Sequence, residues 1–378
     1  MNELTAQAQI KEAVGLLHAK QHPSMILIIV SPRAQRFIHL ARWACDIIHG
    51  VPSIEVKDDW LTRNDQDLYG KIALRMNLKL GGQNHSVDPA DLGCFANRST
   101  MIVGVTIESV PATKGGASTV SIIGIVASSG HGMSQWPANI SIQARKTGLL
   151  HCLNTLIESR LHSWREEHGN RMPEDVVIFH SVESDGDDEL WVEQELPLLP
   201  DMCKKMALGV GQHGPLPRIT IVLVDEHHDA RFFPTADTES SKFGQSLAGT
   251  VVDRGITQPG CWDFFLQPLG LMRIENRPVR YFVIFDEVFR RRSSFPNACL
   301  GPADLLQDLT HKLCYLPGES TRAQGVCSPI HYARQACARM RSYLHLTNCT
   351  PLASNFDGSV DSSRVELHSM VRNTMFYL

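Results

Sequence analysis

The chain has 378 residues, a formal net charge of −4, 43% hydrophobic and 20% charged residues, which are ordinary values for a globular protein with a sizeable core. This charge gives no overall basic field, so any nucleic acid must be bound by a local basic patch. The ten cysteines form no CxxC pair and no zinc spacing, which favours reduced thiols in the cytosol or nucleus. The sequence has no apolar run near the ~20 residues of a membrane helix, and the N-terminus lacks the apolar region of a signal peptide.

The first part of the chain predicts a small α/β unit. Its apolar residues form one short continuous run, MILIIV, between stretches with helical spacing. Gly50 is a suitable helix stop, and a stretch rich in polar residues with Pro89 and Gly93 is typical of a linker. The expected elements are a short amphipathic helix (1–24), a buried strand (25–30), two helices (35–50 and 65–77) and the linker (83–97).

From Thr100 onward the pattern changes to apolar strands interrupted by helices. The expected elements are strands at 101–107, 118–128 and 140–144, a helix at 146–168, a strand at 176–181, a helix at 189–208 and a strand at 218–226, with a loop at 108–117. Hairpin-linked strands followed by crossover-linked strands predict a mixed sheet with helices on its faces. This order is that of the ribonuclease-H-like α/β fold.

In such a sheet the ends of the first and fourth strands lie side by side. Paired carboxylates at those ends hold two metal ions about 4 Å apart for phosphodiester cleavage. Here the two positions carry Thr106 and Ser181. The sequence therefore predicts the frame of a two-metal site without its acidic ligands.

Several motifs follow one another in a characteristic order. The longest is GTVVDRGITQPGCWDFFLQPLGLMRIENRPVRYFVIFDE at 249–287. Shorter ones are LKLGG (78–82), EHHDARFF (226–233), SPIHYARQACARMRSYL (328–344) and the terminal MFYL. Together these motifs resemble the Argonaute family, and the longest, which is the most specific, looks like the core of the family's PIWI domain. The resemblance implies an N-terminal helix (1–24), a partial Rossmann-like MID domain (25–92) and a ribonuclease-H-like PIWI domain (97–378).

The family's catalytic tetrad is not preserved at the matching positions. The two aspartates fall on Thr106 and Ser181, the mobile glutamate on Gly148, and the last ligand on Arg334 in HYAR. A two-metal site needs anionic oxygen ligands, and a guanidinium is always charged and cannot ligate. Arg334 would repel Mg²⁺ and could itself take the cation's place beside a phosphate. The resemblance thus predicts no catalytic residue, no metal and no other cofactor.

A displaced acidic site is the alternative for catalysis. Glu108 and Glu183 lie two residues beyond Thr106 and Ser181, and residues i and i+2 of a strand share a face. Against this, both glutamates are expected in solvated turns. His227 and His228 resemble a metal cluster, but adjacent residues at a strand end point to opposite sides.

The basic residues matter more for binding. In Argonautes the 5′ phosphate of the guide lies between MID and PIWI, and by resemblance Arg42, Arg75, Lys79 and Arg339 match its cationic contacts. The aromatic residue that would stack on the first base falls on Ile38, and a neutral contact falls on Ile54. The alternative is a solvated basic face.

The sequence therefore predicts an Argonaute-like protein of RNA-mediated silencing that binds nucleic acid without cutting it. Expected partners are a small guide-like RNA or DNA, its target RNA and proteins of the silencing machinery, but no membrane. The expected location is the cytoplasm or nucleus. The alternatives are an endonuclease that uses Glu108 and Glu183, and an interaction scaffold that binds no nucleic acid.

Overall fold

The computed structural model describes most of the chain. The described residues are 3–63, 65–88, 95, 99–111, 119–144, 149–182, 203, 216–241, 244–269, 277–290, 301–344 and 366–378. Gly148, Glu183 and the helix expected at 189–208 (apart from Cys203) lie outside them. No helix in these ranges is both long and apolar enough to span a membrane.

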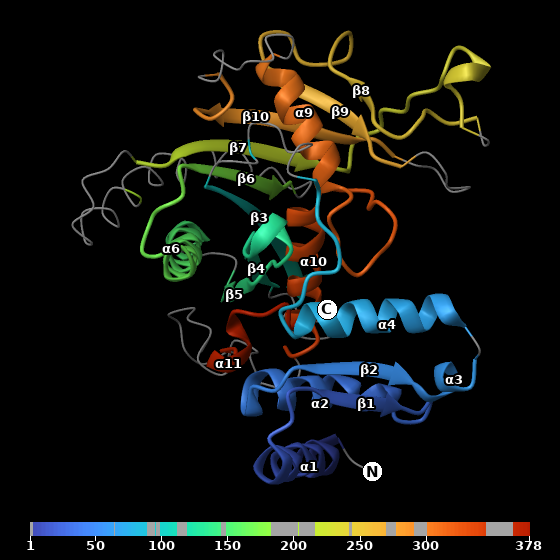
Figure 1. The fold of residues 1–378 in the computed structure, drawn as a ribbon, viewed down its shortest axis with the longest axis vertical. Helices are drawn as coiled ribbons and strands as arrows, with labels where there is room; N and C mark the ends of the chain where they lie inside the picture. The colour runs from blue at the N-terminus through green and yellow to red at the C-terminus, as the bar shows by residue number, and fades with distance from the viewer. Residues whose placement is uncertain are drawn as a thin grey trace.

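The N-terminal unit is a two-stranded parallel sheet with helices around it, at the blue end of the chain in Figure 1. Its elements are α1 (Glu3–Gln21), β1 (Ile26–Val30), η1 (Gln35–Phe37), α2 (Ile38–Trp43), η2 (Ala44–His49), β2 (Ser53–Lys57), α3 (Asp58–Leu61) and α4 (Gln66–Lys79). The helix expected at 35–50 is present as three successive segments, the last a π-helix that ends at the left-handed Gly50. Asp65 caps α4 by accepting a hydrogen bond from the Leu68 N–H.

The second unit is built on one eight-stranded mixed sheet, in the order β5-β4-β3-β6-β7-β10-β9-β8. Its strands are β3 (Thr100–Pro111), β4 (Thr119–Ala127), β5 (Ala138–Ala144), β6 (Asp175–Ser181), β7 (Arg218–Asp225), β8 (Thr250–Val252), β9 (Trp262–Gln267) and β10 (Val279–Asp286). The pairs β3–β6 and β6–β7 are parallel and the other pairs are antiparallel. This arrangement confirms the mixed-sheet α/β fold.

One expected boundary was wrong, because β3 does not turn after Ile107. It continues to Pro111, and Glu108 pairs with Ile122 of β4. The antiparallel partner supplies hydrogen bonds along the whole length of β3, so polar residues that read as a turn remain in the ladder. Glu108 is therefore a half-buried strand residue and not part of a solvated turn.

Helices cover both faces of this sheet (Figure 1). On one face, α6 (Leu149–Glu167) packs Leu153, Ile157 and Leu161 against Val103 and Val105. On the other face lie α9 (Pro302–Leu313) and α10 (Ser328–Arg341). Two glycines let α10 come close: a Cβ at Gly104 would stand 2.1 Å from the Pro329 carbonyl oxygen, and one at Gly124 would stand 2.5 Å from Cys337 Sγ.

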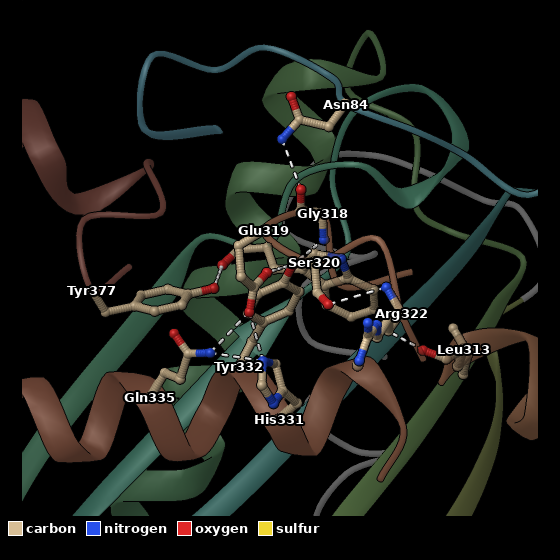
Figure 2. Close-up of polar contacts among 12 residues, drawn as sticks. Asn84, Leu313, Gly318, Glu319, Ser320, Arg322, His331, Tyr332, Gln335 and Tyr377 are labelled. Atoms are coloured by element: carbon tan, nitrogen blue, oxygen red, sulfur yellow. Dashed lines mark hydrogen bonds and ion pairs between the residues drawn. The ribbon is translucent and has the colours of Figure 1, made fainter. Parts of the chain in front are cut away.

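A buried carboxylate fixes the loop that leads into α10. Figure 2 shows Glu319 among side chains of α10: Tyr332 donates to one carboxylate oxygen at 2.8 Å, and His331 and Gln335 contact the other at 2.6 and 3.0 Å. Burial alone would raise the pKa of Glu319, but the hydrogen bonds from His331, Tyr332 and the backbone, together with the charge of His331, outweigh it and hold the pKa at about 2. The Asn84 side chain also donates to the Gly318 carbonyl at 2.8 Å, which ties this loop to the segment after α4.

The C-terminal tail connects the two units. It contains α11 (Ser369–Arg372) and the buried Met375, Phe376 and Tyr377. Its contacts reach the N-terminal unit, where the His368 N–H donates to the Asp46 carbonyl at 3.0 Å. They also reach the large sheet, because the Tyr377 hydroxyl donates to the Trp136 carbonyl at 2.6 Å.

Candidate nucleic-acid interface

Arg334 of α10 lies over the carboxyl ends of the parallel strands. Its Nη2 donates to Ser181 Oγ at 2.9 Å, and its Nη1 forms an ion pair with Glu226, the residue after β7. The arginine side chain is 33% exposed and the glutamate side chain 27%, although the Glu226 Oε2 atom that faces Arg334 is itself buried.

The Thr106 side chain points to the same face of the sheet as Ser181, because alternate residues of a strand share a face. Ile102 and Phe179 both pack on the α10 side of the sheet, and Thr106 and Ser181 follow them by even steps. Val105 pairs with His180, so Thr106 and Ser181 are the next residues of the two strands. The Thr106 hydroxyl is buried and has no hydrogen-bond partner among the described residues. Thr106, Ser181, Glu226 and Arg334 are referred to below as the sheet-edge cluster.

These residues do not fit a pair of divalent metal ions. Mg²⁺ prefers several anionic oxygens in near-octahedral geometry, and the one carboxylate of the sheet-edge cluster is already paired with Arg334. The guanidinium stands where a second positive charge would be repelled. The chemistry of the cluster therefore suits an oxyanion better than a metal ion.

A second group lies where α4, η2 and α10 meet. Lys79 is 1% exposed, and its Nζ donates to the carbonyls of Ser53 at 2.7 Å and Phe376 at 2.8 Å. Burial lowers the pKa of Lys79 well below its usual value, and the nearby Arg339, Arg42 and Arg75 lower it further. These electrostatic contacts bring Arg42, Arg75, Lys79 and Arg339 into one region, called here the basic junction.

Each cation of the basic junction has a different environment. Arg339 is 6% exposed and donates through Nε to Asp46 Oδ2 at 2.9 Å, while its Nη2 finds no hydrogen-bond partner among the described residues. Burial alone would lower the pKa of Arg339, but Asp46 beside it raises the pKa instead. Tyr343 donates to the same Asp46 oxygen.

The other two arginines lie closer to solvent. Arg42 is paired with Glu55, and burial together with Arg339 lowers the pKa of Arg42 to about 10. Arg75 is exposed on α4, one turn before the buried Lys79. The three arginines outnumber the two carboxylates, Asp46 and Glu55, and leave an excess of positive charge even without Lys79, whose charged form is disfavoured by burial. Such an excess suits a terminal phosphate, which carries about −1.5 to −2 charges at pH 7.

Known proteins resemble this chain over nearly its whole length. The model of the Piwi domain matches residues 24–345. This chain belongs to the Piwi domain family. Several curated relatives are argonaute proteins, which confirms the resemblance drawn from the motifs. They include argonaute-2 of Drosophila melanogaster (29% identical, 88% of this chain and 26% of the relative) and argonaute 3 of Oryza sativa (27% identical, 75% and 24%). The chain thus spans about a quarter of the length of these two relatives.

Solved structures share the fold of this Piwi domain and of the unit before it. The C-terminal lobe of a budding yeast Argonaute superposes with a TM-score of 0.81 at 22% identity, over 97% of this chain and 71% of that one. The Kluyveromyces polysporus Argonaute with a guide RNA gives a TM-score of 0.80 at 21% identity, over 97% and 43%. The ribonuclease-H-like fold of the eight-stranded sheet follows from these matches.

Within this Piwi domain the structure brings Thr106, Ser181 and Arg334 together, as expected from the tetrad register. Gly148 and Glu183 lie outside the described residues. Glu108 forms an ion pair with Arg341, so this acid of the displaced-site alternative already has a cationic partner. The ring of His228 contacts the Pro278 carbonyl at 2.9 Å and packs edge-on against Phe265, which is a structural role.

Sequence reasoning missed the three carboxylates that accompany the cations. Asp46, Glu55 and Glu226 each pair with one of the arginines expected to be functional. Glu55 had a local signal, because it stands in a strand beside the helix of Arg42. Asp46 and Glu226 meet their partners only through the tertiary fold. Ile38, at the position of the family's stacking aromatic residue, is partly buried in α2, and Ile54, at the position of a neutral contact, is buried in β2.

Proposed function

We propose that this chain binds a guide-like RNA by its 5′ phosphate and does not cleave the strand paired with it. The observation that carries the proposal is the basic junction, where Arg42, Arg75 and Lys79 of one unit meet Arg339 of the other. The unpartnered Nη2 of the buried Arg339 supports it further, because a buried guanidinium nitrogen without a partner is costly until an acceptor arrives. The relative in one of the superposed structures is named with its guide RNA.

The lack of cleavage is proposed from the sheet-edge cluster. Thr106, Ser181 and Arg334 provide two neutral hydroxyls and a cation where a two-metal site needs carboxylates. The competing endonuclease would depend on Glu108 and Glu183. The competing scaffold would bind no nucleic acid, and its basic junction would serve only to hold the two units together.

The wider assignments follow as parts of the same proposal. We divide the chain into an N-terminal helix (1–24), a partial MID domain (25–92) and a PIWI domain (97–378). Target RNA and proteins of the silencing machinery are the proposed partners, and the cytoplasm or nucleus is the proposed location. A DNA guide is the alternative ligand for the basic junction.

Arg75 provides the sharpest test of the binding site, because it is exposed and its removal should leave the fold intact. Binding of a short single-stranded RNA is measured with a 5′ phosphate and with a 5′ hydroxyl, for the wild type, Arg75→Ala and Lys71→Ala. Lys71 is the matched control, since it is exposed one turn earlier on α4. We expect about tenfold weaker binding of the phosphorylated RNA for Arg75→Ala alone.

The 5′-hydroxyl RNA separates the proposal from general charge attraction. It should bind the wild type more weakly than the phosphorylated RNA, and Arg75→Ala should change its affinity little. Equal affinity of the two RNAs for the wild type would overturn the guide anchor, and the absence of binding by either RNA would favour the scaffold. A parallel series with 5′-phosphorylated DNA decides between the two kinds of guide.

A further inference from the structure

We propose that Glu226 is the resident counter-ion of an oxyanion site at Arg334, and that a phosphodiester group of a bound RNA strand takes its place. This inference depends on the proposed function, because it requires that the chain binds RNA. It differs from a metal-ion centre in the sign of the ligand's charge, since the residues select an anion.

The position of the sheet-edge cluster is the first argument. In open sheets of α/β proteins, ligands bind beyond the carboxyl ends of parallel strands. The strands β3, β6 and β7 are the parallel strands of this sheet, and Thr106, Ser181 and Glu226 lie at or just beyond the end of their pairing. Arg334 reaches the same edge from α10 and contacts the last two directly.

The second argument is the chemistry of Arg334. A guanidinium presents parallel N–H donors that match the oxygens of a carboxylate or a phosphate. Its Nη2 is held by Ser181 and its Nη1 by Glu226, so the fork is already oriented around an anionic group. The buried Thr106 hydroxyl without a partner is a further neutral donor at this edge.

The third argument is that the exchange is energetically easy. The side chains of Arg334 and Glu226 are 33% and 27% exposed, and ion pairs between partly exposed side chains add little to stability. An incoming phosphodiester therefore replaces a weak bond with a similar or stronger one. Until it arrives, the charge of Glu226 neutralises Arg334 and repels the RNA backbone.

This exchange predicts opposite effects for the two members of one ion pair. Arg334→Gln removes the phosphate contact, while Glu226→Gln removes the competitor and leaves Arg334 free. The protein is first loaded with a 5′-phosphorylated guide RNA, and binding of a complementary RNA is then measured at several salt concentrations. We expect about tenfold weaker binding for Arg334→Gln. The slope of log affinity against log salt concentration should also be smaller, by about the amount that one phosphate contact contributes. Glu226→Gln should bind about threefold more tightly than the wild type.

The pair formed by Arg341 and Glu108 is the matched control. It joins the same helix α10 to the same sheet, two turns further along. Arg341→Gln and Glu108→Gln should change the affinity for complementary RNA by less than about twofold. If these two control variants reproduce the opposite effects of Arg334→Gln and Glu226→Gln, the cause is the overall electrostatic field of the protein, and the proposed exchange is overturned.

The outcomes also separate this inference from the proposed function. Loss of guide loading in the wild type would refute the proposed function, and the exchange with it. If guide loading is normal and Arg334→Gln and Glu226→Gln bind complementary RNA as tightly as the wild type, the exchange alone is refuted. Weaker binding by both variants would mean that the ion pair is structural, and thermal melting of each variant shows whether folding is the reason.

Discussion

Arg339 of α10 and Asp46 of η2 form a buried ion pair that joins the two units of the chain, with 2.9 Å between Arg339 Nε and Asp46 Oδ2. Both side chains are shielded from water, so neither charge can be solvated if the other is removed. Asp46 also has one buried oxygen without a hydrogen-bond partner among the described residues. The pair is thus a structural link at the place where a phosphate is proposed to bind.

The first prediction concerns this link. Asp46→Asn should lower the free energy of unfolding by about 3–5 kcal/mol, because the buried Arg339 loses its counter-charge. A short 5′-phosphorylated RNA should then restore more stability than it adds to the wild type, since its phosphate replaces the missing carboxylate. Urea unfolding with and without RNA measures both effects. Glu55→Gln is the control, because its partner Arg42 is partly exposed. The Glu55→Gln substitution should lower the free energy of unfolding by about 1 kcal/mol or less.

The second prediction concerns catalysis. With a paired guide and target, the purified protein should not cleave the target RNA in Mg²⁺ or Mn²⁺, because the sheet-edge cluster offers no free carboxylate. Product formation is followed on denaturing gels over hours. Metal-dependent cleavage that Glu108→Ala or Glu183→Ala abolishes would instead establish the displaced acidic site.

The third prediction concerns the close approach of α10 to β3. Gly104→Ala should destabilise the protein by at least about 1–3 kcal/mol, because the new Cβ would overlap the Pro329 carbonyl and push the helix away. Gly70→Ala is the matched control, since a Cβ at this position of α4 meets no atom within 4 Å. It should instead stabilise the protein by about 0.4–1 kcal/mol. Thermal unfolding of both variants measures the two effects. Equal losses of stability in Gly104→Ala and Gly70→Ala would contradict the prediction.

The fourth prediction concerns acid stability. The pKa of Glu319 is about 2, below its ordinary value of 4.5, so its contribution is complete above pH 4.5 and is lost as the pH falls toward 2. The difference amounts to about 3 kcal/mol. Glu319→Gln should therefore be less stable than the wild type at pH 6, with a gap that narrows as the pH falls from 4.5 toward 2. Urea unfolding at pH 6, 4 and 3 checks this, and a gap that does not change with pH would refute it.

The strands and their relation to α10 could be predicted from the sequence, because long apolar runs and a family register carry that information. Strands β4 and β6 lie within one residue of the expected bounds, and Arg334 contacts Ser181 as the register required. The full length of β3 could not be predicted in this way. Its last four residues are stabilised by pairing with β4, a contact that their own polarity does not reveal.

The acidic partners of the arginines could not be predicted from the sequence. Asp46 and Arg339 are 293 residues apart in the chain, and no local pattern connects them. Glu226 stands in the EHHDARFF match, and only its contact with Arg334 connects it to the proposed exchange. The cationic residues can be recognised by their positions in motifs. The acidic residues that pair with them come close only in the folded chain, so the sequence does not identify them.

The contact between Lys79 and Phe376 has a consequence for synthesis on the ribosome. These residues are 297 positions apart, so at about 5–20 residues per second the N-terminal unit waits about 15–60 s for the carbonyl that binds its buried lysine. During this interval the Lys79 ammonium lacks one of its two acceptors, and Asp46 lacks Arg339. The N-terminal unit is therefore completed only after the large sheet has been synthesised, and its buried charges lack these partners until then.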